Sequence, residues 1–255
     1  MSQQWTEQIE SLCARTGVAH IDVLVDHAGW GHSVLPAMGV IQPFVSWYSL
    51  FTDTPEQHLL AQAPILMRLH LEHSSHRAWL QELLLRLGDT PRMLLLISPL
   101  PFAALAARLR GLSRLEWGGR KGLLRYFDSR IFPSLLATVL DQEQKERFLA
   151  AGLFWGWVDR DHHLAWRHGT CSPSAPMEVA TPPIVLSDSQ FDLLGSIGDA
   201  QQLLTVAARR LPGLTAEQCF TRCHEWVLQA GRENYFGCLT LYLEKQLAET
   251  SVLQK

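Results

Sequence analysis

The chain has 255 residues, of which 47% are hydrophobic and 18% charged, and its formal net charge at pH 7 is −3. These proportions are typical of a packed globular protein that is long enough to bury a full core, and they exclude a disordered chain. The small negative charge and the lack of a long Lys/Arg run argue against nucleic acid as the main ligand, because phosphate binding depends on clustered cations.

The sequence carries no signal for export or membrane insertion. Residues 1–12 are polar, without a basic flank that leads into an apolar core. The most hydrophobic window, residues 93–107, is too short to span a bilayer and is interrupted by Pro99 and Pro101. Five cysteines without a paired framework suit a reducing compartment. We therefore expect a cytoplasmic protein with no membrane partner.

Strand and helix signals alternate through the first two thirds of the chain. Strands are expected at residues 21–25, 44–51, 64–71, 93–97, 112–117, 123–127, 153–158 and 164–167. Helices are expected at residues 5–16, from Thr54, at 74–87 with Ser74 or Ser75 as the cap, at 102–110, at 135–140 and from Asp141. This alternation predicts an α+β, α/β-like lobe over residues 1–170, with a mixed β-sheet and flanking helices.

The composition changes after this lobe. Residues 171–186 are rich in Pro and Ser and read as a connection. Beyond them every strong signal is helical, which predicts a small helical lobe over residues 187–255. Four helices are expected there, at 187–194, 199–211, 215–230 and 235–250, with caps at Asp199 and Thr215 and a break at Gly198.

The most informative stretch is residues 120–132, in which an apolar segment ends in Arg125, Asp128 and Arg130. Gly118 and Gly119 can take the positive φ angles of a two-residue hairpin turn before it. The favoured interpretation of the three charged residues is a structural ion-pair network. A partner contact is the second interpretation, and catalysis the least favoured, because two permanently charged guanidinium groups and one carboxylate make a poor acid–base set.

A strand over residues 123–127 makes a definite prediction about its faces. Leu123 and Phe127 would share one face with Arg125, while Leu124 and Tyr126 would face the other way together with Asp128. Asp128 is expected to cap the short helix that follows.

The segment 120–132 stands in a recognisable order with other short motifs. These motifs are residues 49–56 and 64–66 upstream, and 135–136 and 141–144 downstream. In this order and spacing the chain resembles, over residues 18–168, the type VI secretion adaptor and effector-chaperone (Tap/TEC) family, whose shared domain is of unknown function. The family usually has Pro where this chain has Ser129.

The resemblance implies a non-enzymatic cytoplasmic adaptor without a cofactor. Such a protein binds one type VI secretion effector, stabilises it and helps to load it onto the VgrG spike. We expect the helical lobe, or the cleft between the lobes, to select the effector through a groove or an exposed apolar patch.

Trp155 and Trp157 are the other candidate partner-binding residues. They stand two apart in an expected strand and should face the same side. That side is either core or a binding patch, since tryptophan is common in both.

Two metal or redox candidates are not favoured. His70, His73 and His76 are spaced by three, and two such steps on a helix spread the imidazoles apart instead of converging them. Cys219 and Cys223 lack the redox spacing and a second cysteine pair, so buried inert thiols are expected. We expect no metal.

The enzymatic alternative has no positive motif. A Gly-x-Ser-x-Gly elbow, a phosphate-binding loop and a dinucleotide fingerprint are all missing from the sequence. The alternative function, a small-molecule-binding or hydrolytic α/β enzyme, would instead depend on a pocket near residues 26–32, where Asp26, His27 and His32 would supply the chemistry.

Overall fold

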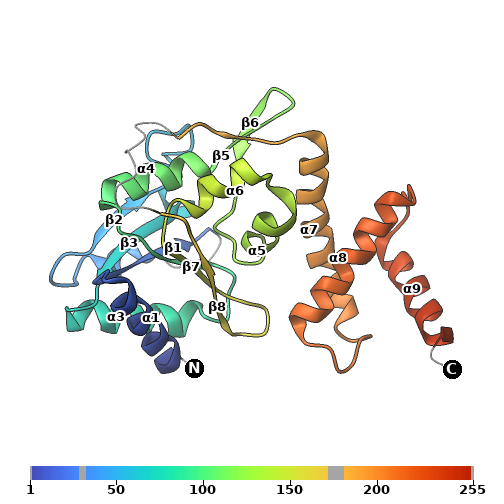
Figure 1. The fold of residues 1–255 in the computed structure, drawn as a ribbon, viewed down its shortest axis with the longest axis horizontal. Helices are drawn as coiled ribbons and strands as arrows, with labels where there is room; N and C mark the ends of the chain where they lie inside the picture. The colour runs from blue at the N-terminus through green and yellow to red at the C-terminus, as the bar shows by residue number, and fades with distance from the viewer. Residues whose placement is uncertain (1, 29–32, 172–180, 254–255) are drawn as a thin grey trace.

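The computed structural model describes residues 2–28, 33–171 and 181–253. A six-stranded sheet forms the centre of the larger part, and three helices form a separate layer at the C-terminal end (Figure 1). The predicted α+β class is confirmed.

The central sheet has the strand order β2-β3-β1-β4-β7-β8, and each neighbouring pair is antiparallel. Its strands are β1 (His20–Asp26), β2 (Ser46–Ser49), β3 (Pro64–His70), β4 (Met93–Ile97), β7 (Phe154–Val158) and β8 (Leu164–His168). The middle strands are buried along nearly their whole length because both faces of the sheet are covered. Two buried charges, Asp22 on β1 and Arg68 on β3, pair with each other through two hydrogen bonds of 2.7 and 2.8 Å.

Two groups of helices cover the two faces. On one face α1 (Ser2–Thr16) and α3 (Ser74–Leu87) pack over β1 and β3. The other face is covered by α4 (Phe102–Leu112), α5 (Phe132–Ser134), the π-helical turn η2 (Leu135–Val139) and α6 (Gln142–Leu149). The short helices α2 (Leu35–Met38) and η1 (Leu60–Gln62) lie in the connections between strands. Within the described ranges, no helix is both long enough and apolar enough to cross a membrane.

A smaller sheet projects from this layer. The strands β5 (Arg114–Trp117) and β6 (Arg120–Leu123) form the predicted hairpin, with Gly118 and Gly119 at φ 53° and 73°. A short strand that the sequence did not predict, β9 (Ile184–Val185), pairs with β5 in parallel. This strand lies at the end of the expected connection, and its Ile184 is buried in the main core.

The C-terminal part consists of α7 (Asp188–Ala207), α8 (Ala216–Arg232) and α9 (Leu239–Leu253). The predicted break at Gly198 and the cap at Asp199 are wrong, because α7 runs through both residues. A glycine inside a helix costs only about 1 kcal/mol, and the burial of Ile197 and Leu203 on either side outweighs it. The predicted cap at Thr215 is confirmed, since its side chain accepts from the backbone N–H of Gln218.

Three further local predictions are wrong. The helix expected from Thr54 is replaced by a series of turns. The helix α3 begins after His73 without a side-chain cap, and Ser75 donates instead to the carbonyl of Gln42. The strand expected over residues 123–127 ends at Leu123, so the predicted alternation of faces does not occur.

Candidate functional site

The cluster of Arg125, Asp128 and Arg130 resolves into two separate ion pairs. Arg125 donates to the buried carboxylate of Asp26 over 2.7 Å. Asp128, which is 6% exposed, accepts from the Nε and Nη2 atoms of Arg130 at 3.0 and 2.6 Å. This paired hydrogen bond raises the pKa of Arg130. Each cation is held by a carboxylate, which is what a structural network requires.

Asp128 shapes a turn instead of capping a helix. Its side chain accepts from the backbone N–H of Arg130, and its carbonyl accepts from Ile131 and Phe132. The helix α5 follows with Ile131 at its cap and no side-chain hydrogen bond there, so the predicted cap is wrong. The turn sends the chain directly into the core at Phe132, which is fully buried.

The segment before this turn is buried irregularly. Leu124, Tyr126 and Phe127 all lie in the core, whereas the side chain of Arg125 is 54% exposed. The guanidinium of Arg125 nevertheless lies 5.7 Å from the centre of the Phe127 ring, so the two side chains are neighbours as predicted. The contact does not come from strand alternation, because the backbone has left the ladder of β6. The buried Tyr126 hydroxyl donates to the carbonyl of Leu109, and this bond anchors the segment to α4.

Trp155 and Trp157 face the same side of β7, as predicted, and that side belongs to the core. Trp155 is fully buried, and its indole N–H donates to the carbonyl of Phe148. Trp157 is half-buried against the same cluster, with its ring 5.8 Å from that of Phe132. Because Trp155 has no exposed surface, the two residues do not form a surface patch together.

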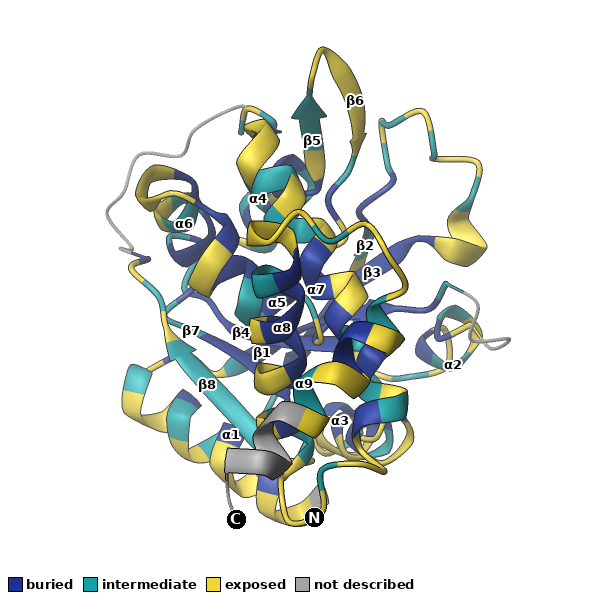
Figure 2. Ribbon diagram, turned by 90° about the vertical axis from the view of Figure 1, so that its right-hand side faces the viewer, coloured by how far each residue is buried: buried dark blue, intermediate teal, exposed yellow. Residues whose placement is uncertain are grey.

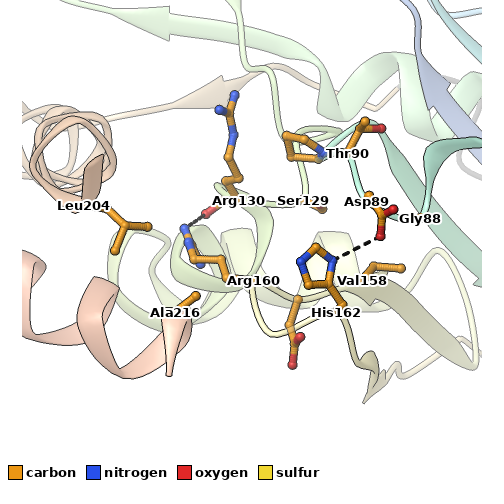
Figure 3. Close-up of a pocket in the computed structure, with 12 residues that line it drawn as sticks. Gly88, Asp89, Thr90, Ser129, Arg130, Val158, Arg160, His162, Leu204 and Ala216 are labelled. Carbon is orange, nitrogen blue, oxygen red and sulfur yellow. Dashed lines mark hydrogen bonds and ion pairs between the residues drawn. The ribbon is translucent and has the colours of Figure 1, made fainter. Parts of the chain in front are cut away.

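A polar cluster that joins several elements is centred on Arg160, in the turn between β7 and β8. Its guanidinium donates to both carboxylate oxygens of Glu217 at 3.1 Å and to the side chain of Gln201. It also donates to the carbonyl of Arg130 over 2.9 Å (Figure 3). The same guanidinium lies 3.5 Å from the centre of the Phe220 ring. One side chain thus joins the turn after β7, the Asp128 turn, α7 and α8. We call this set the Arg160 joint.

Burial lowers the pKa of Arg160, and the charge of Glu217 opposes that shift. The neighbouring Asp161 strengthens the same joint, because its carboxylate accepts from the backbone N–H groups of Ala216 and Glu217 at the start of α8. A carboxylate at this position is favourable for the helix dipole. The turn between β7 and β8 therefore holds the N-terminus of α8 by its charge and by its hydrogen bonds.

A small cavity of about 240 Å³ opens beside the joint. Figure 3 shows His162 directed toward Asp89 there, with its Nδ1 atom 3.3 Å from a carboxylate oxygen of Asp89. Arg130 and Arg160 border the same space, but their donors are committed to Asp128 and to the joint. This arrangement locks the two parts of the molecule together and offers few free polar groups to a ligand.

The alternative pocket near residues 26–32 can be judged at Asp26 and His27, since His32 lies outside the described residues. Asp26 is buried and pairs with Arg125, and its other oxygen accepts from the backbone N–H of Ala28. Burial lowers the pKa of His27. The carboxylate is thus engaged in structural bonds on both oxygens.

The rings of His70, His73 and His76 lie close together, with centroids 5.2 to 6.1 Å apart, so the predicted spreading of the imidazoles is wrong. The run crosses from the end of β3 to the start of α3 and does not follow one helix. His76 is buried and uses both ring nitrogens, one toward the backbone N–H of His70 and the other toward the carbonyl of Pro43. His70 and His73 instead flank Glu72 at 3.5 and 3.8 Å. In the part of the chain that the structure describes, no three His, Cys, Asp or Glu residues are placed to hold a metal ion.

The predicted cysteine pair on α8 is buried. Burial raises the pKa of Cys219 and raises that of Cys223 to about 11, so both thiols stay protonated and inert. The adjacent His224 forms a 2.9 Å hydrogen bond with the hydroxyl of Ser196 on α7. Burial, followed by the charge of Arg160, lowers the pKa of His224.

An apolar groove lies on the helical part, away from the sheet. It has a volume of about 870 Å³ and is formed by α7, by the end of α8 and by residues 235–239. Figure 2 shows α7, α8 and α9 together on the face turned toward the viewer. Phe191, Val227 and Tyr235 contribute to its lining, and Phe236 stands at its edge with 94% of its surface exposed. We call this feature the Phe236 groove.

Sequence reasoning missed the central residue of each feature. Arg160 falls in the connection between the strands expected at 153–158 and 164–167, and its partners Gln201 and Glu217 lie 41 and 57 residues away. Phe236 was taken as a member of a helix, but it precedes α9. An apolar groove is present on the helical part, and its use in selecting an effector stays a prediction, as does that of the cleft between the lobes.

The comparisons with known proteins complete this description. No curated protein and no solved structure was found to be similar to the chain. One family model matches residues 23–147, which are 125 of the 255 residues. The matched segment runs from β1 through the Arg125, Asp128 and Arg130 cluster to α6 and stops before Arg160 and the helical part. Over this segment the chain is similar to the family described as Domain of unknown function (DUF4123).

Proposed function

We propose that this protein is a cytoplasmic adaptor that binds one type VI secretion effector, keeps it soluble and helps to load it onto the VgrG spike. The match to the DUF4123 model and the order of short motifs over residues 18–168 support the proposal. Both concern the scaffold, so the effector-binding surface has to be sought elsewhere.

The single observation that carries the proposal is the Phe236 groove. An exposed apolar groove of about 870 Å³ costs the free protein solvation free energy, which burial against a partner recovers. Aromatic side chains at such a surface are common anchors of protein–protein binding. Phe236 is the most exposed large hydrophobic side chain among the described residues.

The two long helices that form the groove are held in place by other contacts. The helix α7 shares the main core through Ile197 and Ala200, and the Arg160 joint fixes α8. Near the start of α7, the ring of Phe191 stacks on that of Trp117 with centroids 3.8 Å apart. A preformed surface of this kind loses little entropy when it binds.

The proposal includes no catalytic step. The thiols of Cys219 and Cys223 are buried and protonated, and the carboxylates of Asp26 and Asp128 are held in ion pairs. The protein would act by binding alone, with the effector and the spike protein as its partners.

The test is co-expression with an effector encoded beside this gene. We expect the effector to be soluble and to co-purify only when this protein is present. The variant Phe236→Ser should lower the co-purified amount by about tenfold, as expected for a hot-spot residue. The matched control is Phe44→Ser, an exposed phenylalanine on the other part of the molecule, which should leave the amount unchanged. An effector that stays soluble and is delivered normally without this protein would refute the adaptor function.

A further inference from the structure

The Phe236 groove has a shape that suits a helix more than a strand. Its walls are helices, whose backbone groups are already hydrogen-bonded, so an incoming strand would find no ladder to extend. The lining on α7 runs from Ser189 to Asp199, which is roughly 15 Å along the axis at 1.5 Å per residue. This length accommodates about three turns of a partner helix.

Two glycines keep the groove open. Gly195 on α7 and Gly231 at the end of α8 both line it and are both exposed. A Cβ atom built at either position would have no neighbour within 4 Å. Larger residues would fill the space that a partner side chain needs, although the helices themselves would accept them.

The charges on the two rims differ in sign. Asp192 and Asp199 are exposed on the α7 rim, seven residues or two helical turns apart, and both line the groove. Among the described residues neither carboxylate has an ion-pair partner. The opposite rim carries Arg232. The groove is therefore apolar along its floor, acidic along one side and basic at one point on the other.

We propose that the Phe236 groove binds an amphipathic partner helix whose apolar stripe is flanked by basic residues on the α7 side, spaced to meet Asp192 and Asp199. The identification of this helix as part of an effector rests on the proposed function. The binding surface itself is defined by the groove and can be tested without an effector.

The probe is a fluorescein-labelled helical peptide of about 18 residues with leucines at i, i+3, i+4 and i+7 and two lysines seven residues apart beside them. A comparison peptide of the same design carries glutamates in place of the lysines. Binding is followed by fluorescence anisotropy against the full chain. We expect the lysine peptide to bind about tenfold more tightly than the glutamate peptide, with a preference that shrinks as salt is added.

Two glycine variants locate the site. Gly195→Leu should weaken the lysine peptide by at least about tenfold because it fills the groove. Gly198→Leu is the matched control, since Gly198 is exposed on the same helix, has the same open space around a built Cβ, and does not line the groove. It should bind the peptide like the unchanged protein. Thermal unfolding of both variants should show no loss of stability.

The double variant Asp192→Lys/Asp199→Lys should reverse the preference and favour the glutamate peptide. The inference is overturned if the lysine peptide does not bind saturably, if Gly195→Leu binds it as well as Gly198→Leu does, or if peptide charge has no effect. A groove closed by a second copy of the chain is a further contradicting outcome, visible as dimerisation that Gly195→Leu abolishes.

These results separate the two proposals. An effector that co-purifies equally well with Gly195→Leu leaves the adaptor function standing and rejects this groove as its site. Binding of the lysine peptide without any co-purified effector rejects the adaptor function and keeps the groove.

Discussion

The Arg160 joint and the Phe236 groove both involve α7 and α8, but a charged side chain is buried in the joint, whereas an apolar side chain is exposed in the groove. The joint buries a guanidinium and satisfies it with Glu217, Gln201 and the carbonyl of Arg130. The groove leaves a phenylalanine almost fully in water. Burying such a side chain would contribute roughly 2 kcal/mol, so its exposure is a cost that only a partner removes. The joint is therefore expected to govern folding, and the groove to govern binding.

The largest effect is expected at the joint. Arg160→Met removes the cation and leaves the carboxylate of Glu217 and the amide of Gln201 without their donors, so the free energy of unfolding should fall by about 3 kcal/mol. Urea unfolding measures this difference. The control is Arg222→Met on the exposed side of α8, whose pair with Glu225 is solvated and should contribute less than about 1 kcal/mol. Equal losses in the two variants would contradict the role of the joint.

Asp128→Ala is expected to cause the second-largest loss in the free energy of unfolding. It removes the acceptor of three hydrogen bonds from Arg130 and should lower the free energy of unfolding by about 2 kcal/mol. Asp89→Ala, at an exposed ion pair, is the control and should cost less than about 0.5 kcal/mol. Effector binding should fall only through lost stability. A well-folded Asp128→Ala protein that no longer binds effector would instead place this residue in the interface.

The third expectation concerns how the free energy of unfolding depends on pH through His224. This residue is hydrogen-bonded to Ser196, and its ring stacks beside that of Phe220. Its pKa is lowered in the folded state, first by burial and then by Arg160, so the unfolded chain takes up the proton more readily. This contribution to stability is complete above the ordinary pKa of about 6.5 and is lost as the pH falls below it. The slope of the unfolding free energy against pH, measured from pH 7 to 5, should be smaller in His224→Gln. An unchanged slope would show that the pKa of His224 is not lowered by folding.

The smallest effect is expected in the groove. Gly195→Ala should raise the free energy of unfolding by about 0.5 to 1 kcal/mol, because alanine has the higher helix propensity and its Cβ meets no neighbour. Gly198→Ala should show a similar gain. Both are measurable by urea unfolding. A loss of stability in Gly195→Ala would mean that the groove already has an occupant in the free protein.

Local sequence signals were enough to predict many of the strands, turns and helix ends. The apolar runs of β1, β3 and β4, the Gly118 and Gly119 turn and the cap of α8 at Thr215 are confirmed, because each depends on neighbouring residues or on a short periodicity. The predictions failed where distant packing outweighs a local preference. The segment after Leu123 leaves its strand to bury Tyr126 and Phe127 together, and α7 continues through Gly198 because its neighbours are buried.

The sequence by itself determined the α+β class, most element positions and the order of short motifs on which the family resemblance rests, since these follow from residues close together along the chain. Only the tertiary structure decided that Arg160 donates both to the carbonyl of Arg130 and to the carboxylate of Glu217. It also decided that Phe236 remains outside the core. The physical reason is that ion pairs and grooves are built from elements far apart in sequence. Their formation depends on how helices and strands pack, which no local pattern records.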